Sequence, residues 1–208
     1  MENQSQLNQM NNQSTGMQNT NRGGHELLDM HEVLSCTIGV LDQFMIYKSF
    51  VKDNELMTIM NRQYNFILSQ YNLTVECYTT GQKPNQDTTM YTMPQAANQI
   101  NYGLTPSQPK KPIQSVNEIK DAQISGFMLG ELKSTASHMT IAALEVTNPV
   151  VRRVVAAQIE NYIEMAYEIF LYQNKHGYYQ VPQLDQADAQ AMLRAYAPAT
   201  GQPQIPMQ

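Results

Sequence analysis

Apolar side chains recur at helical spacing in two segments of the first half of the chain. Spacings of three and four residues place them on one face of an α-helix. The first segment, from His25 to Phe50, carries Leu27, Leu28, Leu34, Ile38, Leu41, Phe44 and Met45. The second follows the N-cap candidates Asp53 and Asn54 and carries Leu56, Ile59, Met60, Tyr64, Ile67, Tyr71, Val75 and Tyr78. Gly81 and Pro84 indicate a helix end, so we expect two antiparallel helices joined by a short turn.

The second half of the chain repeats this arrangement. A helix is expected from about Glu118 to Thr147, with a stripe of Ile124, Phe127, Met128, Leu132, Met139, Ala142, Ala143 and Val146. Asn148 can cap the next helix, and Pro149 fits its first turn because no N–H is needed there. That helix runs to His176 through Val151, Val154, Val155, Ile159, Tyr162, Met165, Ile169 and Tyr172. Gly177 ends it and Pro182 blocks its extension.

The two hairpins are joined by residues 82–117, which contain five prolines and no apolar period. A helix of about 27 residues is about 40 Å long, and a crossover of this length can run the full length of such a helix. The sequence therefore predicts an all-α, ferritin-like four-helix bundle over residues 23–182, built from two helical hairpins and a long crossover. We expect the crossover to pack loosely on the bundle, so that proteases cut it early.

Both ends of the chain differ from the bundle in composition. Half of residues 1–22 are Asn or Gln, and we expect this tail to be disordered. Residues 183–208 predict a short helix, from Asp185 to Ala197, and a Pro/Gln-rich tail.

Charge and hydropathy exclude several classes of function. The net charge is −5, only 15% of residues are charged, and basic pairs are few, which argues against nucleic-acid binding. We expect no membrane span, because no apolar run reaches 18 residues. Met1 to Arg22 lacks the apolar region of a secretory signal. Cys36 and Cys77 predict two small buried thiols; their helical offset of about 13 Å argues against a disulfide.

A ferritin-like bundle raises the question of a two-metal centre, which needs Glu-x-x-His motifs on facing helices. The sequence contains none, nor a Gly-x-Ser-x-Gly elbow. The positions expected inward at mid-bundle are apolar or phenolic: Ile38, Tyr64, Ile67, Leu129, Leu132, Tyr162 and Met165. We therefore expect a packed core with no metal, no cofactor and no catalytic residue.

Two groups of polar residues leave alternatives open. His31, Glu76, His138 and Gln158 are all expected at one end of the bundle, where they are either a mononuclear metal site or unrelated side chains. Glu160, Glu164 and Glu168 recur every four residues, and we interpret them as a solvated or partner-facing stripe. His176 suits a helix C-terminus, where a cation is favoured.

The second hairpin resembles the Coat F domain of endospore-forming bacteria. The resemblance covers roughly residues 118–182, most closely Ala142 to Arg152, then Gln158, Tyr172 and the Lys175-His176-Gly177-Tyr178-Tyr179 end. It implies a ferritin-like fold and a structural role in the spore coat, without catalysis and with other coat proteins as partners; a homo-oligomer is left open. It also implies synthesis in the mother-cell cytoplasm. The alternatives are a ferritin-like metal-binding oxidoreductase and a cytosolic helical adaptor.

Overall fold

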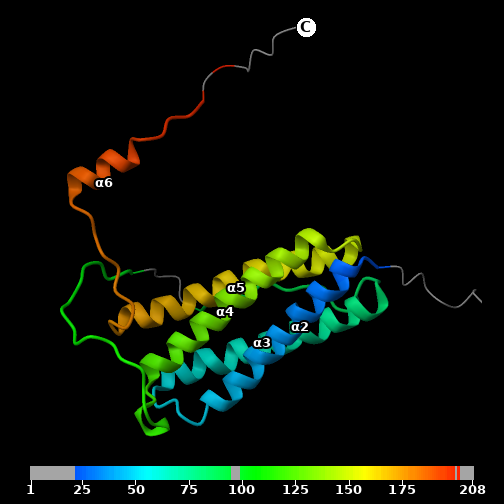
Figure 1. The fold of residues 1–208 in the computed structure, drawn as a ribbon, viewed down its shortest axis with the longest axis horizontal. Helices are drawn as coiled ribbons and strands as arrows, with labels where there is room; N and C mark the ends of the chain where they lie inside the picture. The colour runs from blue at the N-terminus through cyan, green and yellow to red at the C-terminus, as the bar shows by residue number, and fades with distance from the viewer. Residues whose placement is uncertain (1–21, 95–98, 200, 202–208) are drawn as a thin grey trace, which may run out of the picture.

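Four long helices form a bundle in the computed structural model, which describes residues 22–94, 99–199 and 201. They are α2 (Gly24–Tyr47), α3 (Asn54–Thr80), α4 (Asp121–Glu145) and α5 (Pro149–Lys175) (Figure 1). A short 3-10 helix, η1 (Val116–Glu118), precedes α4, and α6 (Gln186–Leu193) follows the bundle.

The helix ends lie where the sequence places them in α3 and α5. The Asp53 carboxylate accepts hydrogen bonds from the backbone N–H of Glu55 and Leu56, so it caps α3. Gly81 follows with a φ of 68°, in the left-handed conformation that favours glycine. The Asn148 side chain caps α5 in the same way, with Pro149 at its first position. Helix α2 ends at Tyr47, three residues before the expected end, and α4 begins only after η1.

The crossover gives the bundle its ferritin-like topology. Helix α2 packs against α3 and α4, and α5 packs against the same two helices, so α2 and α5 lie on a diagonal. The backbone N–H of Lys52 donates to Asp121 at 2.9 Å, which places the start of α4 beside the α2–α3 turn. At the other end, the Asn148 amide donates to the Gly81 carbonyl at 3.1 Å. Two antiparallel hairpins with parallel α3 and α4 are the predicted fold class.

The core is apolar along most of the bundle, but five positions expected on the inward faces are exposed. Ile38 keeps 42% of its surface exposed, and Leu27, Leu28, Met45 and Phe127 are also exposed. Helix α2 instead turns a neighbouring stripe inward: Met30, Val33, Thr37, Val40 and Phe44. The other expected mid-bundle residues are buried, except for half-buried Tyr64. Helix α2 has apolar residues on two adjacent faces, so periodicity alone could not choose between them.

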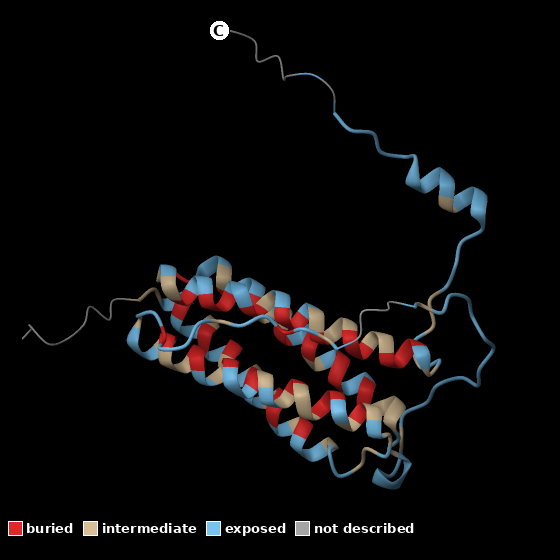
Figure 2. Ribbon diagram, turned by 180° about the vertical axis from the view of Figure 1, so that it is seen from behind, coloured by how far each residue is buried: buried red, intermediate tan, exposed pale blue. Residues whose placement is uncertain are grey.

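The first part of the crossover, residues 82–94, is called the strap here. It lies along the groove between α3 and α5, and the buried part of this line is visible in Figure 2. Tyr91 is buried in the core, and Pro84 is buried as well. The expectation of a loose crossover is therefore wrong for the strap. Residues 103–112, in contrast, are all exposed.

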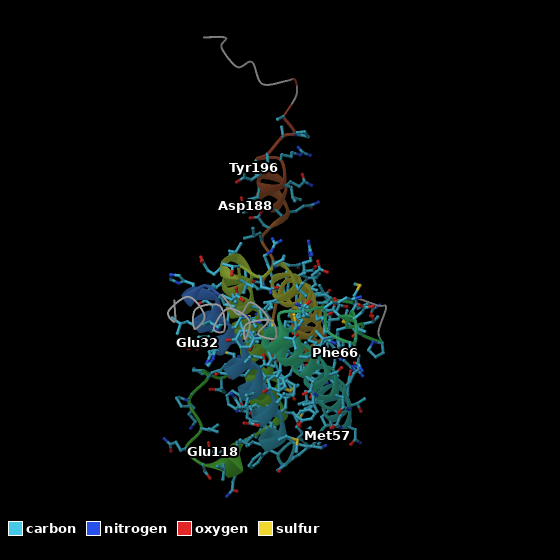
Figure 3. All side chains as sticks on the ribbon, turned by 90° about the vertical axis from the view of Figure 1, so that its right-hand side faces the viewer. Glu32, Met57, Phe66, Glu118, Asp188 and Tyr196 are labelled. Carbon is cyan, nitrogen blue, oxygen red and sulfur yellow. The ribbon has the colours of Figure 1, made fainter. Side chains whose placement is uncertain are left out.

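Helix α6 stands apart from the bundle. Figure 3 shows Asp188 and Tyr196 on an arm that extends away from the four helices. Among residues 186–193, only Ala189 is even half-buried. The helix is shorter than the expected Asp185 to Ala197 stretch. Of the N-terminal tail, Arg22 alone belongs to the described residues, and the prediction of disorder for the rest lies outside them.

Candidate functional site

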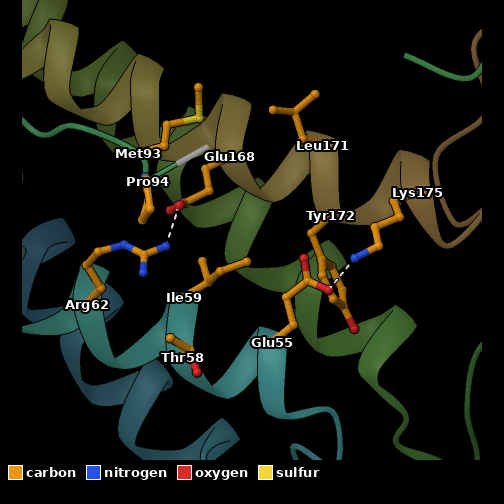
Figure 4. A pocket seen from close by; sticks show the side chains of 10 residues that line it. All are labelled: Glu55, Thr58, Ile59, Arg62, Met93, Pro94, Glu168, Leu171, Tyr172 and Lys175. Carbon is orange, nitrogen blue, oxygen red and sulfur yellow. Dashed lines mark hydrogen bonds and ion pairs between the residues drawn. The ribbon is translucent and has the colours of Figure 1, made fainter. Parts of the chain in front are cut away.

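A buried charged cluster joins α3, α5 and the strap. The Glu168 carboxylate on α5 forms an ion pair with Arg62 on α3 (Figure 4). The same carboxylate accepts hydrogen bonds from the Gln63 side-chain amide at 2.9 Å and from the Tyr91 hydroxyl at 2.5 Å. Arg62 Nε in turn donates to the Tyr91 hydroxyl at 3.0 Å. Three donors from two other segments thus surround one carboxylate.

The position of Glu168 corrects the interpretation of the acidic stripe. Glu160 is exposed and Glu164 is half-buried, but Glu168 is buried. A step of four residues turns about 40° around a helix, so three such residues span about 80°. The last member therefore turns toward α3, where Arg62 meets it. Helical spacing within α5 does not reveal this, because the deciding partner lies 106 residues away.

The cluster holds its protons in a fixed arrangement. Burial, together with the hydrogen bond and negative charge of Glu168, raises the pKa of Tyr91 far above its usual range. Although burial opposes it, hydrogen bonding to Tyr91 and Glu168 raises the pKa of Arg62. The phenol therefore stays a donor and the guanidinium stays charged. Both oxygens of Glu168 already accept hydrogen bonds from these donors, so the carboxylate is unsuited to act as a free general base.

Asn161 on α5 holds the strap in place through its backbone. Its side-chain oxygen accepts from the Tyr91 N–H at 2.7 Å, and its amide donates to the Thr89 carbonyl at 3.0 Å. Gln70 of α3 donates to the Thr89 hydroxyl at 3.2 Å. The Tyr91 ring meets Phe66 edge-on, with centroids 5.1 Å apart. Backbone and side-chain contacts together fix residues 89–91 between the two helices.

A cavity of about 270 Å³ lies beside this cluster, bordered by Met93 and Pro94 of the strap (Figure 4). Its charged groups are paired: Lys175 bonds to Glu55 at 2.8 Å, and Arg62 bonds to Glu168. Among the described residues that line it, the wall therefore has no unpaired charge to select an ionic ligand, and no side chain positioned as a nucleophile beside a base.

A second buried carboxylate, Glu26, lies at the opposite end of the bundle. It accepts from the Thr147 N–H at 2.9 Å, from the Thr147 hydroxyl, and from the Asn148 N–H at 3.1 Å. Arg22 is 3.7 Å away as its cationic partner. Glu26 thereby ties the start of α2 to the turn between α4 and α5. The sequence gives no sign of this role, because an acidic residue in a first turn ordinarily only complements the helix dipole.

Other residues of the Coat F-like pattern also bond across the bundle. Gln158 donates to the Thr74 hydroxyl at 2.6 Å, linking α5 to α3. Tyr172 is buried. His176 lies 3.9 Å from both Asp53 and Glu55 at the start of α3, and its ring stacks on Tyr178. This helix-terminal histidine therefore faces acidic partners as well as the helix dipole.

The structure does not bring the four-residue constellation together. His31 lies edge-on to Tyr78, Glu76 accepts from the Asn85 backbone, and His138 donates to the Ser134 carbonyl. Gln158 is engaged with Thr74. Within the described part of the chain, no three His, Cys, Asp or Glu residues gather in a metal-binding arrangement.

The two cysteines are unpaired thiols, and the expectation that both are buried holds for Cys77 alone. Cys77 is buried, and burial raises its pKa to about 11. Cys36 is half-buried, and its pKa is raised by burial and by the charge of Glu32. Neither thiol has the lowered pKa of a reactive cysteine.

No helix of the described residues is long and apolar enough to cross a bilayer.

The fold and its polar clusters define a ferritin-like helical bundle in which many inward polar side chains bond to one another. Comparison with known proteins places it further: residues 120–182 match the Coat F domain family. The chain is 58% identical over 200 residues to the spore coat protein F-like protein YhcQ of Bacillus subtilis (strain 168), covering 96% of this chain and 92% of that protein. The chain belongs to this spore coat protein F-like family.

A solved structure supports the fold. It is the crystal structure of a protein of Bacillus halodurans C-125, provisionally described as a spore coat protein. It superposes with a TM-score of 0.55 at 13% identity, covering 79% of this chain and 96% of that one. At this identity the likeness concerns the fold alone.

Proposed function

We propose that this chain is a structural, non-catalytic component of the bacterial endospore coat. Family membership supports association with the coat. One observation supports a structural role: the polar residues of the family pattern bond to distant parts of the same chain. Thr147 and Asn148 bond to Glu26, and Gln158 bonds to Thr74. Side chains used in this way hold the helices in register.

The proposed partners are neighbouring coat proteins. In this proposal the protein is made in the mother-cell cytoplasm and is then laid down on the forming spore. The exposed crossover, residues 103–112, and the arm around α6 supply polar, extended surface for such contacts. Exposed apolar side chains on this arm, Met192, Leu193 and Tyr196, suit contacts that form when the arm meets another protein.

Fractionation of purified spores tests the location. An epitope-tagged copy expressed from its own promoter is expected only in sporulating cultures, and in the extract released when spores are stripped of coat. A coat protein and a cytosolic enzyme, each of known location, serve as fractionation controls. Recovery with the enzyme, or steady expression during vegetative growth, would contradict the proposal and favour a cytosolic adaptor.

Elemental analysis tests the absence of redox chemistry. Protein purified without chelator is expected to carry iron, manganese and zinc far below one atom per chain. A ferritin-like oxidoreductase would retain close to one or two transition-metal ions per chain. Stoichiometric metal that survives gel filtration would therefore replace the structural proposal with the oxidoreductase alternative.

A further inference from the structure

Helices α2 and α3 carry a second apolar stripe in addition to the one each turns into the core. On α2 it consists of Leu27, His31, Leu34, Ile38 and Met45, with Leu41, which is buried against the core, completing the spacing. On α3 it consists of Met57, Asn61, Tyr64, Leu68, Tyr71, Val75 and Tyr78. Both stripes follow the alternating three- and four-residue spacing of a helix–helix seam. Together they are called the outer α2–α3 face.

The two stripes lie side by side on the surface of one hairpin. The His31 ring meets Tyr78 edge-on, with centroids 6.4 Å apart. Near the other end, Met45 and Tyr64 line the same hollow of about 260 Å³. These two pairs fix the position of α2 along the axis of α3. They place Ile38 and Leu68 at similar positions along the length of the bundle. Both remain exposed, Ile38 at 42% and Leu68 at 37%.

The face is almost free of charge in a protein of net charge −5. Between Glu32 and Lys48, helix α2 carries Asp42 as its only charged residue. Between Arg62, which turns to Glu168, and Glu76, helix α3 carries none. A core rich in Tyr, Met and Leu and poor in charge is typical of protein–protein interfaces. Two copies of an acidic chain can meet here with little like-charge repulsion.

The stripe on α2 is also symmetric about its middle. Leu27 and Met45 lie nine residues on either side of residue 36, and Leu34 and Ile38 lie two residues on either side. A two-fold axis at this level therefore brings Leu27 of one copy to Met45 of the other. Such self-complementarity is what an isologous dimer requires.

The size of the outer α2–α3 face is also consistent with a second copy of this chain as the partner. Helices of this length extend about 40 Å, and two neighbouring helices present a strip about 20 Å wide. The resulting patch of about 800 Å² matches the share that one partner contributes to a standard interface.

We propose that the outer α2–α3 face is the interface of a two-fold symmetric homodimer. Four helices, α2 and α3 from each copy, pack across it with their stripes antiparallel. Leu34 and Ile38 of α2 lie closest to the axis, and Tyr71 of α3 lies near the same level. Leu68 lies one turn from Tyr71, with half-buried Tyr64 and Tyr71 on either side of it. The assembly uses a surface separate from the strap and from α6, and does not depend on the coat function proposed above.

Sedimentation equilibrium of the full chain tests this proposal. The wild type is expected at twice the chain mass of 23.6 kDa. Ile38→Glu/Leu68→Glu places four carboxylates near the axis and is expected to raise the dimer Kd at least about 100-fold, because like charges at an interface cost several kcal/mol. The matched control is Ile141→Glu/Ile163→Glu, at 57% and 59% exposed residues of α4 and α5. It should remain dimeric.

Circular dichroism melts establish that each variant folds. If Ile38→Glu/Leu68→Glu does not fold, the milder double variant Ile38→Ser/Leu68→Ser is tested in its place. A wild-type chain that stays monomeric up to about 100 µM overturns the proposal; such a face would then serve another protein. Dimers that survive the glutamate pair, or that dissociate equally in the control, overturn it as well.

Discussion

Buried carboxylates in this bundle are satisfied by partners that lie far away in the chain. Glu168 bonds to Arg62, Gln63 and Tyr91, and Glu26 bonds to the turn at Thr147. Removing one member of such a group leaves the others buried without a partner, which costs more than the bond itself is worth. The two glutamates are therefore structural residues. Their contribution to stability could not be seen from the residues next to them in the sequence.

A comparison of two glutamates on α5 measures the contribution of Glu168 to the free energy of unfolding. Glu168→Gln is expected to lower the free energy of unfolding by about 1–3 kcal/mol, because Arg62 loses its anionic partner in a largely buried site. Glu164→Gln, one turn earlier and half-buried, should change it by no more than about 0.5 kcal/mol. Urea denaturation of both variants gives the difference.

The same two variants separate an ion pair from a metal centre. If Glu168 supports the fold through Arg62, adding chelator leaves both unfolding curves unchanged. A loss of stability on chelation in the wild type, absent from Glu168→Gln, would show instead that Glu168 ligates a metal.

The thiols are predicted to react slowly and in a fixed order. With a pKa of about 11, Cys77 at pH 8 carries about a hundredfold less thiolate than at its ordinary pKa of 9.0. Because the thiolate is the nucleophile, Cys77 should resist iodoacetamide until the protein unfolds, while half-buried Cys36 reacts first. Peptide mapping after timed alkylation measures both rates. It should detect no Cys36–Cys77 disulfide; finding one would contradict the pairing of α2 with α3.

Helix ends were predictable from the sequence, whereas helix faces were less so. Asp53, Gly81, Asn148 and Pro149 act through local geometry, and each occupies the position that its chemistry indicates. Ile38 was placed inward because it continues the stripe of Leu34 and Leu41, but the packed face lies one residue away, at Thr37. Two adjacent apolar faces on one helix satisfy the same period, so only the position of neighbouring helices decides between them.

Core truncations in two helices test the observed faces. Leu132 of α4 is fully buried, and Leu132→Ala is expected to cost about 2–5 kcal/mol through lost burial and a cavity. Ile159 of α5 is only half-buried, so Ile159→Ala should cost about half as much. Equal losses in chemical denaturation would contradict the described orientation of α5.

The crossover is predicted to show two different protease sensitivities. Chymotrypsin should cut first after the exposed Tyr102 and Leu104, while Tyr91 stays protected between α3 and α5. Tyr91→Ala removes the ring from its place against Phe66 and should make residues 88–93 cleavable by a protease of broad specificity such as proteinase K, because chymotrypsin no longer has an aromatic residue to cut after there. Tyr91→Phe keeps the ring and serves as the control. Early cutting at Tyr91 in the wild type would show that the strap is as loose as its proline content suggests.

At the scale of the whole molecule, the sequence predicted the topology better than the site. Two capped hairpins and a 36-residue connection leave few arrangements other than a ferritin-like bundle. The charged cluster could not be predicted, because it needs Arg62, Tyr91 and Glu168 from three separated segments. Nothing in the spacing of residues 82–94 marks Tyr91 as the one that enters the core.

The arm beyond the bundle is expected to contribute no stability. Residues 183–199 are almost entirely exposed, so they bury little area that unfolding could release. The denaturant dependence of the unfolding free energy scales with the area exposed. A chain ending at Pro182 should therefore keep the full-length midpoint and slope, with differences of no more than about 0.5 kcal/mol. It retains the Tyr102–Val181 contact, so the anchored end of the crossover is unchanged. A clear loss of midpoint and slope in urea would show that α6 packs on the bundle in solution.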